Sequence, residues 1–469
     1  MSDENTSHNN FPDLQDATRV HQEQKIRRAL EAYRFFFPTV SVEAVFRGFR
    51  SVGAVDNRSA VILVTAPRHL NFTANSDTSY AGCVLDLRAA GPMLIELPAG
   101  PLVGMIDDHH QRWVADLGLP GPFGARGGRH LILPPDWTGP EPQGDWHVSR
   151  CTTYQALVLL RAVPVDGDTI RARALLETVV IRPEEESDAR AEFLPCDDRD
   201  MDTTPLAWED NLEYWRVLHE VLDDEPPLRE FRPMLGALAE LGIEAGKLFA
   251  PDSATERLLT EVARRGHDEM LVSAFASYRP DCVAWPDRVW EWVNLRPENG
   301  DFEREGSLDV EARDRWFAQT VASSPAVARR APGQGSVYWL ANRDADGTYL
   351  KGGSTYRLTV PLPVPASLFW SVTCYDARTR SEVRAPQQQA ALRSLTEDLT
   401  GDGETVDLYF GPEKPQGADG RWIQTEPGHE WFAYFRVYGP GEATFDGSWR
   451  PGDFVPVVLS GAVAGPSSQ

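Results

Sequence analysis

The densest group of side chains able to do acid–base chemistry is the run Asp107-Asp108-His109-His110. It follows an apolar run, Leu102–Ile106, that has the composition of a β-strand. If the strand continues, alternation places Asp107 and His109 on one face, and Asp108 and His110 on the other. Either pair has the groups to transfer a proton or to bind a divalent metal ion.

A metal site here would use His109, His110 and Asp107 as ligands, with His130, His147 or Asp77 completing it. The metal ion would activate water or oxygen. Metal-free general base catalysis by His109 or His110 is the second possibility. The third is structural: a strand-end hydrogen-bond cluster in which carboxylates hold the imidazoles in place.

A second polar segment, Asn75-Ser-Asp77-Thr-Ser-Tyr80, lies just before another strand-like run. Its Asn and Asp side chains can form Asx turns that shape a tight loop. The functional alternative places Asp77 and Tyr80 in a pocket, where Tyr80 donates hydrogen bonds or carries a proton. The predicted catalytic residues are therefore Asp77, Tyr80, Asp107, Asp108, His109 and His110.

The predicted substrate-binding residues come from both halves of the chain: Asn75, Arg112, Trp113, Trp370, Tyr375 and Arg378. Arg378, together with Arg380, has the geometry to grip a carboxylate with two hydrogen bonds. The structural alternative is an arginine–aspartate brace with Asp376 at the edge of a sheet. No nucleotide-binding glycine motif, serine-hydrolase elbow, zinc-protease motif or paired-cysteine motif is present.

The balance of acidic and basic residues limits the kinds of partner that this protein is expected to bind. The 469 residues carry 70 acidic and 46 basic side chains, a formal charge of −24, with no dense Lys/Arg run. We therefore expect no nucleic-acid and no membrane partner, but a small-molecule ligand. Five dispersed cysteines argue against a disulfide framework. The polar N-terminus shows no signal segment, so we expect a cytoplasmic protein, and a homodimer is compatible with the sequence.

The pattern of apolar residues predicts an α+β fold that is mainly β: two antiparallel sandwich-like β domains joined by a helical block. We expect residues 1–13 to be disordered, 14–195 to form a helix plus a β-rich domain, and 196–305 to form the helical block. Residues 306–460 are predicted to form a jelly-roll-like sandwich, followed by a tail, 461–469. Two helices, one stopped by Pro38 and one over Val42–Phe49, are expected near the start.

The chain also resembles a known bacterial family. Asn75–Tyr80, Leu85–Leu87 and Gly91–Met93 resemble the module catalogued as domain of unknown function 1254. Its usual companion, domain of unknown function 1214, is resembled by the segments Tyr349–Tyr356, Phe369–Asp376, Asp407–Pro412 and Trp449–Asp453. The resemblance implies two β domains with a helical part between them, and it implies no particular reaction.

Together these features predict an enzyme that transforms a small molecule, using the Asp/His cluster of the N-terminal β domain for acid–base or metal-assisted chemistry. Hydrolysis, lyase chemistry and metal-dependent oxidation all remain open. The alternative is a non-catalytic protein that binds carbohydrates or hydrophobic ligands, because flat tryptophan rings suit such ligands.

Overall fold

One long helix, α1 (Leu14–Ser51), replaces the two helices that the sequence predicts, and Pro38 lies inside it. Proline removes one helical hydrogen bond, which usually ends a helix. The helix continues because the residues on either side of Pro38, including Phe37 and Val40, are fully buried. Burial of such side chains contributes roughly 1.5–3 kcal/mol each, enough to outweigh the lost bond.

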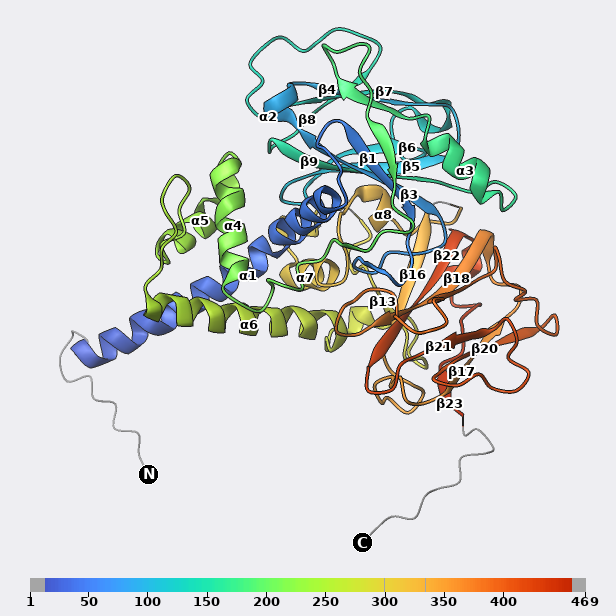
Figure 1. Ribbon diagram of the computed structural model, residues 1–469. Helices are drawn as coiled ribbons and strands as arrows, with labels where there is room; N and C mark the ends of the chain where they lie inside the picture. The colour runs from blue at the N-terminus through green and yellow to red at the C-terminus, as the bar shows by residue number, and fades with distance from the viewer. Residues whose placement is uncertain (1–12, 299, 334, 458–469) are drawn as a thin grey trace, which may run out of the picture. The chain divides into compact units, whose positions relative to one another are not determined.

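The computed structural model describes residues 13–298, 300–333 and 335–457, and Figure 1 shows its elements. The predicted disordered segment, apart from Asp13, and the predicted tail 461–469 lie outside the described residues. The chain divides into two compact units, and the divisions fall inside α1 and inside α6 (Ser253–Phe275). Unit 1 comprises residues 1–40 and 205–270, and unit 2 comprises residues 41–204 and 271–469.

Unit 1 is helical. It combines the first part of α1 with α4 (Glu213–Asp224), the one-turn helix η2 (Arg229–Phe231), α5 (Arg232–Ala239) and most of α6. The Tyr33 hydroxyl donates to the Glu209 carbonyl at 2.6 Å, and the Tyr214 hydroxyl donates to the Tyr33 carbonyl at 2.6 Å. The predicted helices of the central block thus pack against a helix that lies about 180 residues earlier, which sequence order does not reveal.

The first half of unit 2 holds two sheets and a short strand pair (blue to green in Figure 1). The six-stranded sheet has the order β11 (Glu192–Pro195), β1 (Ser59–Val64), β3 (Ser79–Asp86), β9 (Gln155–Ala162), β5 (Leu102–Asp108) and β6 (Trp113–Gly118). The four-stranded sheet has the order β10 (Val180–Pro183), β4 (Met93–Leu97), β7 (Gly128–Leu133) and β8 (His147–Arg150). The pair is β2 (His69–Leu70) with β12 (Met201–Asp202), and the helices are α2 (Leu87–Ala90), η1 (Gly124–Arg126) and α3 (Thr169–Leu176).

In this half of unit 2 most strand pairs are antiparallel, but β1/β11, β2/β12 and β7/β8 are parallel. The charged segment Arg182–Pro205 contributes β11 and β12. A four-residue edge strand needs few apolar side chains, and charge on an edge strand protects it from aggregation. That is why this segment lacks an apolar strand pattern.

The second half of unit 2 also holds two larger sheets (orange to red in Figure 1). One has the order β13 (Glu291–Trp292), β16 (Ser336–Ala341), β22 (Trp431–Pro440), β18 (Ala366–Asp376) and β19 (Ala391–Arg393). The other has the order β21 (Trp422–Gln424), β20 (Thr405–Gly411), β17 (Tyr356–Pro361) and β23 (Phe454–Pro456). Smaller elements are the pair β14 (Glu303–Arg304) with β15 (Ser307–Leu308), helices α7 (Val310–Phe317) and α8 (Pro325–Ala328), and the turns η3 (Pro280–Cys282) and η4 (Glu442–Thr444).

Strand alternation in this half separates an apolar face from a polar one. Trp370, Val372 and Cys374 of β18 belong to a hydrophobic cluster that both sheets share. Ser371, Thr373 and Tyr375 of the same strand lie outside that cluster and point to the other face. All ten residues of β22 are buried, so this strand is covered on both sides.

All five cysteines are buried and unpaired, as expected from their dispersed positions. Among the described residues, no helix has both the length and the apolar character that a membrane crossing requires.

One close contact gives a stability prediction. A Cβ at Gly48 of α1 would lie 2.4 Å from the Asp202 carbonyl oxygen and 2.7 Å from Thr203 Cγ2. Gly48→Ala should therefore lower the free energy of unfolding by about 1–3 kcal/mol, as overpacking does. The matched control is Gly236→Ala in α5, where a Cβ meets nothing within 4 Å. Chemical denaturation should show a gain for the control, about 1 kcal/mol from helix propensity, and the opposite order would contradict the packing account.

Candidate functional site

The predicted Asp/His segment ends a strand instead of continuing it. Strand β5 stops at Asp108, and His109 and His110 lie in the turn that follows. The alternation that would pair Asp107 with His109 therefore does not extend that far. Asp108 shapes the turn: its Oδ1 accepts from the backbone amides of His110 (2.8 Å) and Arg112 (2.9 Å), and its Oδ2 accepts from the Thr152 hydroxyl.

The two imidazoles are enclosed. His109 Nε2 lies 3.2 Å from Glu43 Oε2, and the His109 ring lies 4.9 Å from the Phe46 ring, centroid to centroid. Burial raises the pKa of Glu43, but hydrogen bonding and charge from His109 and Arg47 outweigh it and lower that pKa. His110 is also buried, and burial together with the neighbouring His109 holds its pKa well below the usual value.

Asp107 is fully buried, and its Oδ2 accepts from the Ser323 backbone amide at 2.7 Å. Burial raises the pKa of Asp107 well above its usual value, and the amide of Ser323 only partly offsets this. These contacts are those expected of the structural alternative, in which the segment ties the end of β5 to neighbouring turns. Among the residues that the structure describes, no group of three or more His, Cys, Asp or Glu side chains is placed to hold a metal ion.

The other predicted partners of this segment are spread apart. His130 is buried in the four-stranded sheet beside His147, with ring centroids 5.9 Å apart, and burial lowers its pKa to about 4. Trp113 opens β6 with 47% of its surface exposed. His130 and His147 thus lie in a different sheet from Asp107, whereas Trp113 lies directly opposite Asp107 on the neighbouring strand β6.

The segment Asn75–Tyr80 is different, because it meets the polar face of the sheet that contains β18 and β22. Within the segment, Asn75 Oδ1 accepts from the Asp77 amide at 3.1 Å, the predicted Asx-type turn, and Asn75 Nδ2 donates to the Tyr80 hydroxyl at 2.8 Å. We call the boundary between this segment and that sheet the seam. Across the seam, Asp77 Oδ2 accepts from the Ser371 hydroxyl (2.9 Å) and the Tyr438 hydroxyl (2.8 Å). All of these residues belong to unit 2.

The backbone before Asp77 is held by three donors from the C-terminal half. Arg436 donates to the Thr73 carbonyl at 2.7 Å, Tyr375 to the Ala74 carbonyl at 2.6 Å, and Arg393 to the Ser76 carbonyl at 3.0 Å. Charged and phenolic donors of this kind make strong, directional bonds. The loop that carries Asp77 therefore takes its shape from strands of the other domain.

Glu382 brings a second acid to this seam. It is 3% exposed and follows the turn after β18, where it forms an isolated bridge with Tyr375. Burial raises its pKa to about 8, the charge of Asp77 adds to the increase, and Ser76, Arg393 and Arg436 only partly offset it. Within the described part of the chain, neither Glu382 oxygen has a hydrogen-bond partner, and Asp77 Oδ1 also has none.

Arginine and tyrosine side chains lie beside the two acids at the seam. The Arg436 guanidinium lies over the rings of Tyr375 (5.5 Å) and Tyr434 (5.0 Å). Arg161 of β9 lies over the ring of Tyr80, 5.4 Å from its centroid. We call the six residues Asp77, Tyr80, Arg161, Glu382, Arg436 and Tyr438 the seam cluster, since each acts electrostatically on other members.

The remaining predicted residues divide between core and surface. Trp370 stacks on Phe435 at 5.4 Å inside the sheet core, whereas Tyr375 belongs to the seam. Arg378 is exposed in a turn that Asp376 stabilises by accepting from its backbone amide. Arg380 is buried over the Phe72 ring, so these two arginines do not form the predicted carboxylate grip.

Sequence reasoning missed Arg161, Glu382, Arg436 and Tyr438. One signal was present: in Trp431–Tyr438 the polar residues Tyr434, Arg436 and Tyr438 recur at every second position. On a strand whose other face is apolar, such a repeat marks one face that must find polar partners. Arg161 and Glu382 carry no comparable pattern.

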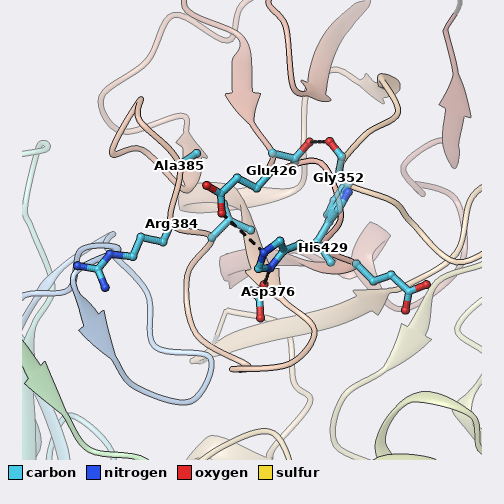
Figure 2. A pocket seen from close by; sticks show the side chains of 10 residues that line it. Gly352, Asp376, Arg384, Ala385, Glu426 and His429 are labelled. Atoms are coloured by element: carbon cyan, nitrogen blue, oxygen red, sulfur yellow. Dashed lines mark hydrogen bonds and ion pairs between the residues drawn. The ribbon is translucent and has the colours of Figure 1, made fainter.

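A separate surface pocket lies at the turn after β18. Its lining includes Asp376, Glu426 and His429, with the His429 Nδ1 atom 2.7 Å from Asp376 Oδ2 (Figure 2). Its free volume of about 10 Å³ holds roughly one water molecule. The pocket is therefore too small for an organic substrate, and the pair serves to brace the turn.

Comparison with known families identifies both halves of unit 2. Residues 61–183 match the model described as a protein of unknown function, DUF1254, and residues 335–442 match the one described as DUF1214. The chain therefore has the two-domain architecture that joins DUF1254 to DUF1214. Asp77, Tyr80 and Arg161 fall in the first domain, and Glu382, Arg436 and Tyr438 fall in the second.

Two solved structures are similar. The VPA0106 protein from Vibrio parahaemolyticus matches with a TM-score of 0.55 and 18% identity, covering 92% of this chain and 100% of that one. An uncharacterised protein from Burkholderia cenocepacia matches with a TM-score of 0.40 and 13% identity, covering 95% and 98%. The first likeness supports a shared fold. No curated protein matches the chain.

Proposed function

We propose that this protein is an enzyme that transforms a small molecule by acid–base catalysis in the seam cluster. The observation that carries the proposal is the pair of buried acids, Asp77 and Glu382, with unpartnered oxygens and with a Glu382 pKa of about 8. Buried polar atoms without partners are costly and cluster at functional sites. A pKa near neutrality suits a general acid or base.

The neighbouring groups suit distinct roles. Glu382 is protonated at neutral pH and can give a proton to a substrate. Asp77, oriented by Ser371 and Tyr438, can accept a proton at Oδ1. Arg436 can stabilise negative charge that develops on the substrate. Hydrolysis and lyase chemistry both fit this set, and oxidation would need a redox partner.

The Asp/His segment is the second candidate for the catalytic site. Its support is the raised pKa of Asp107 and the 3.2 Å pair of His109 with Glu43. Its weakness is enclosure, because all four residues from Asp107 to His110 are buried, whereas the seam cluster has Tyr80 and Arg161 partly exposed beside its buried acids.

A non-catalytic carbohydrate- or hydrophobic-ligand-binding protein is the alternative function. The tyrosine rings around Arg436 favour it, since flat rings suit sugars and aromatic ligands. We further propose a jelly-roll-like sandwich for the C-terminal sheets, supported by their shared hydrophobic cluster. We also propose that unit 1 is a helical block and that the protein forms a homodimer. A cytoplasmic location is proposed because all five thiols are free.

Turnover by the seam cluster can be tested without a known substrate. The purified protein is incubated with a mixture of bacterial metabolites, and consumed and formed masses are compared among variants by mass spectrometry. Glu382→Gln and Asp77→Asn should each abolish the mass changes that wild type causes, because each removes a proton-transfer group. His109→Asn and the surface variant Arg357→Gln should retain them.

Three other outcomes would contradict catalysis by the seam cluster, and each points to a different alternative. Loss in His109→Asn with retention in Glu382→Gln would move the site to the Asp/His segment. Stoichiometric metal found by elemental analysis and lost in that variant would add a metal to that site. No mass change with any form of the protein, together with saturable binding of a mixture component, would favour the binding protein.

A further inference from the structure

Arg161 is a cation of the seam cluster that keeps contact with solvent. It lies on β9 directly opposite Tyr80 of β3, and its side chain is partly exposed. Among the described residues, Arg161 makes no ion pair with a carboxylate. Arginine in proteins commonly pairs with a carboxylate or a phosphate, so a recessed guanidinium without one is suited to an anionic ligand.

Phenol hydroxyls surround Arg161, and that of Tyr438 already donates to Asp77 Oδ2. The hydroxyls of Tyr80, Tyr338 and Tyr438 all lie close enough to act on its charge, and that of Tyr338 is also bonded to Ser336. Burial raises the pKa of Tyr80 and of Tyr438, which keeps these phenols protonated at neutral pH. A guanidinium beside protonated phenols can bind an anion by several charge-assisted hydrogen bonds.

The charges of the seam cluster do not balance. Arg161 and Arg436 are both cations, whereas Glu382 is a neutral acid at pH 7 and Asp77 supplies a single carboxylate. The nearby Arg393 is already paired with Glu397 at 2.9 Å. One positive charge is thus in excess, in a protein whose formal charge is −24. A bound monoanion would neutralise it.

We propose that the seam cluster takes an organic monocarboxylate, whose carboxylate is bound by Arg161 and the Tyr80 hydroxyl, which accepts from Asn75 and keeps its own proton to donate. This inference rests on the proposed function for the location of the site, and it adds the class of substrate. A carboxylate matches the single excess charge and the planar fork of a guanidinium. The Tyr80 and Tyr338 rings, both partly exposed, suit a flat or apolar remainder of the ligand.

The test uses the full chain and matched pairs of probes: benzoate with benzamide, and acetate with acetamide, plus inorganic phosphate. Thermal shift and titration calorimetry should show binding of benzoate and at least tenfold weaker binding of benzamide. Arg161→Gln should lose at least tenfold in benzoate affinity, and Arg161→Lys should keep part of it. Arg357→Gln, an exposed arginine 3.8 Å from Asp407, is the control and should bind as wild type does.

Three results would overturn the inference: no binding of either carboxylate, equal binding of phosphate and benzoate, or unchanged affinity in Arg161→Gln. Arg161→Lys guards against a folding defect, because its unliganded melting temperature should equal that of wild type. Glu382→Gln should still bind benzoate. If benzoate binding depends on Arg161 but no metabolite is turned over, the carboxylate site is supported and the proposed enzyme activity is rejected. If metabolites are turned over but neither carboxylate binds, the enzyme activity is supported and the carboxylate site is rejected.

Discussion

Glu382→Gln is expected to become increasingly more stable than wild type as the pH rises from about 5 to about 9. The folded-state pKa of Glu382 is about 8, against a usual value of 4.5, because burial disfavours the charged carboxylate. Its contribution to stability is therefore complete below pH 4.5 and is lost as the pH rises through about 8. Glutamine does not titrate, so the free energy of unfolding of the variant does not fall by these few kcal/mol as the pH rises.

Urea denaturation of both proteins at several pH values measures this difference. The free-energy difference between variant and wild type should grow in favour of the variant across the interval and level off above pH 9. Glu413→Gln is the matched control, because Glu413 is exposed, and its curve should run parallel to that of wild type. Parallel curves for Glu382→Gln as well would show that Glu382 ionises normally in the fold.

Asp77→Ala is expected to lower the free energy of unfolding by about 3 kcal/mol, since it leaves the Ser371 and Tyr438 hydroxyls buried without their acceptor. Asp77→Asn should cost less, because an amide oxygen can still accept from a hydroxyl. Chemical denaturation of both variants gives the comparison. Asp419→Ala, at an exposed surface pair with Lys414, should change little.

A double-mutant cycle sharpens this second prediction. Tyr438→Phe alone removes one donor to Asp77, and in the Asp77→Ala background it should cost markedly less than in wild type. Additive effects of the two substitutions would mean that the 2.8 Å bond between Tyr438 and Asp77 contributes nothing to stability.

The strands of the first domain were predictable because their signals are local. The run 102–106 was expected as a strand and forms most of β5. The Asx turn at Asn75 was predictable for the same reason. Pro38 shows the limit of local rules, since burial of its neighbours keeps α1 continuous.

Only two of the six residues of the seam cluster were predictable from the sequence. Asp77 and Tyr80 stand out as polar residues before a strand, but Arg161 joins them through the register of β3 with β9. Arg436 and Tyr438 join through the packing of a sheet that lies about 360 residues later in the chain. Register and sheet packing depend on the whole fold, so no window of sequence contains them.

The loop before Asp77 has a consequence for synthesis of the protein. Its carbonyl groups are held by Tyr375, Arg393 and Arg436, which leave the ribosome some 300 residues after the loop itself. Because domains fold from the N-terminus as they emerge, the first β domain must wait with this loop unsupported. A truncated or half-made chain would thus carry Asp77 without the three donors that hold the loop before it.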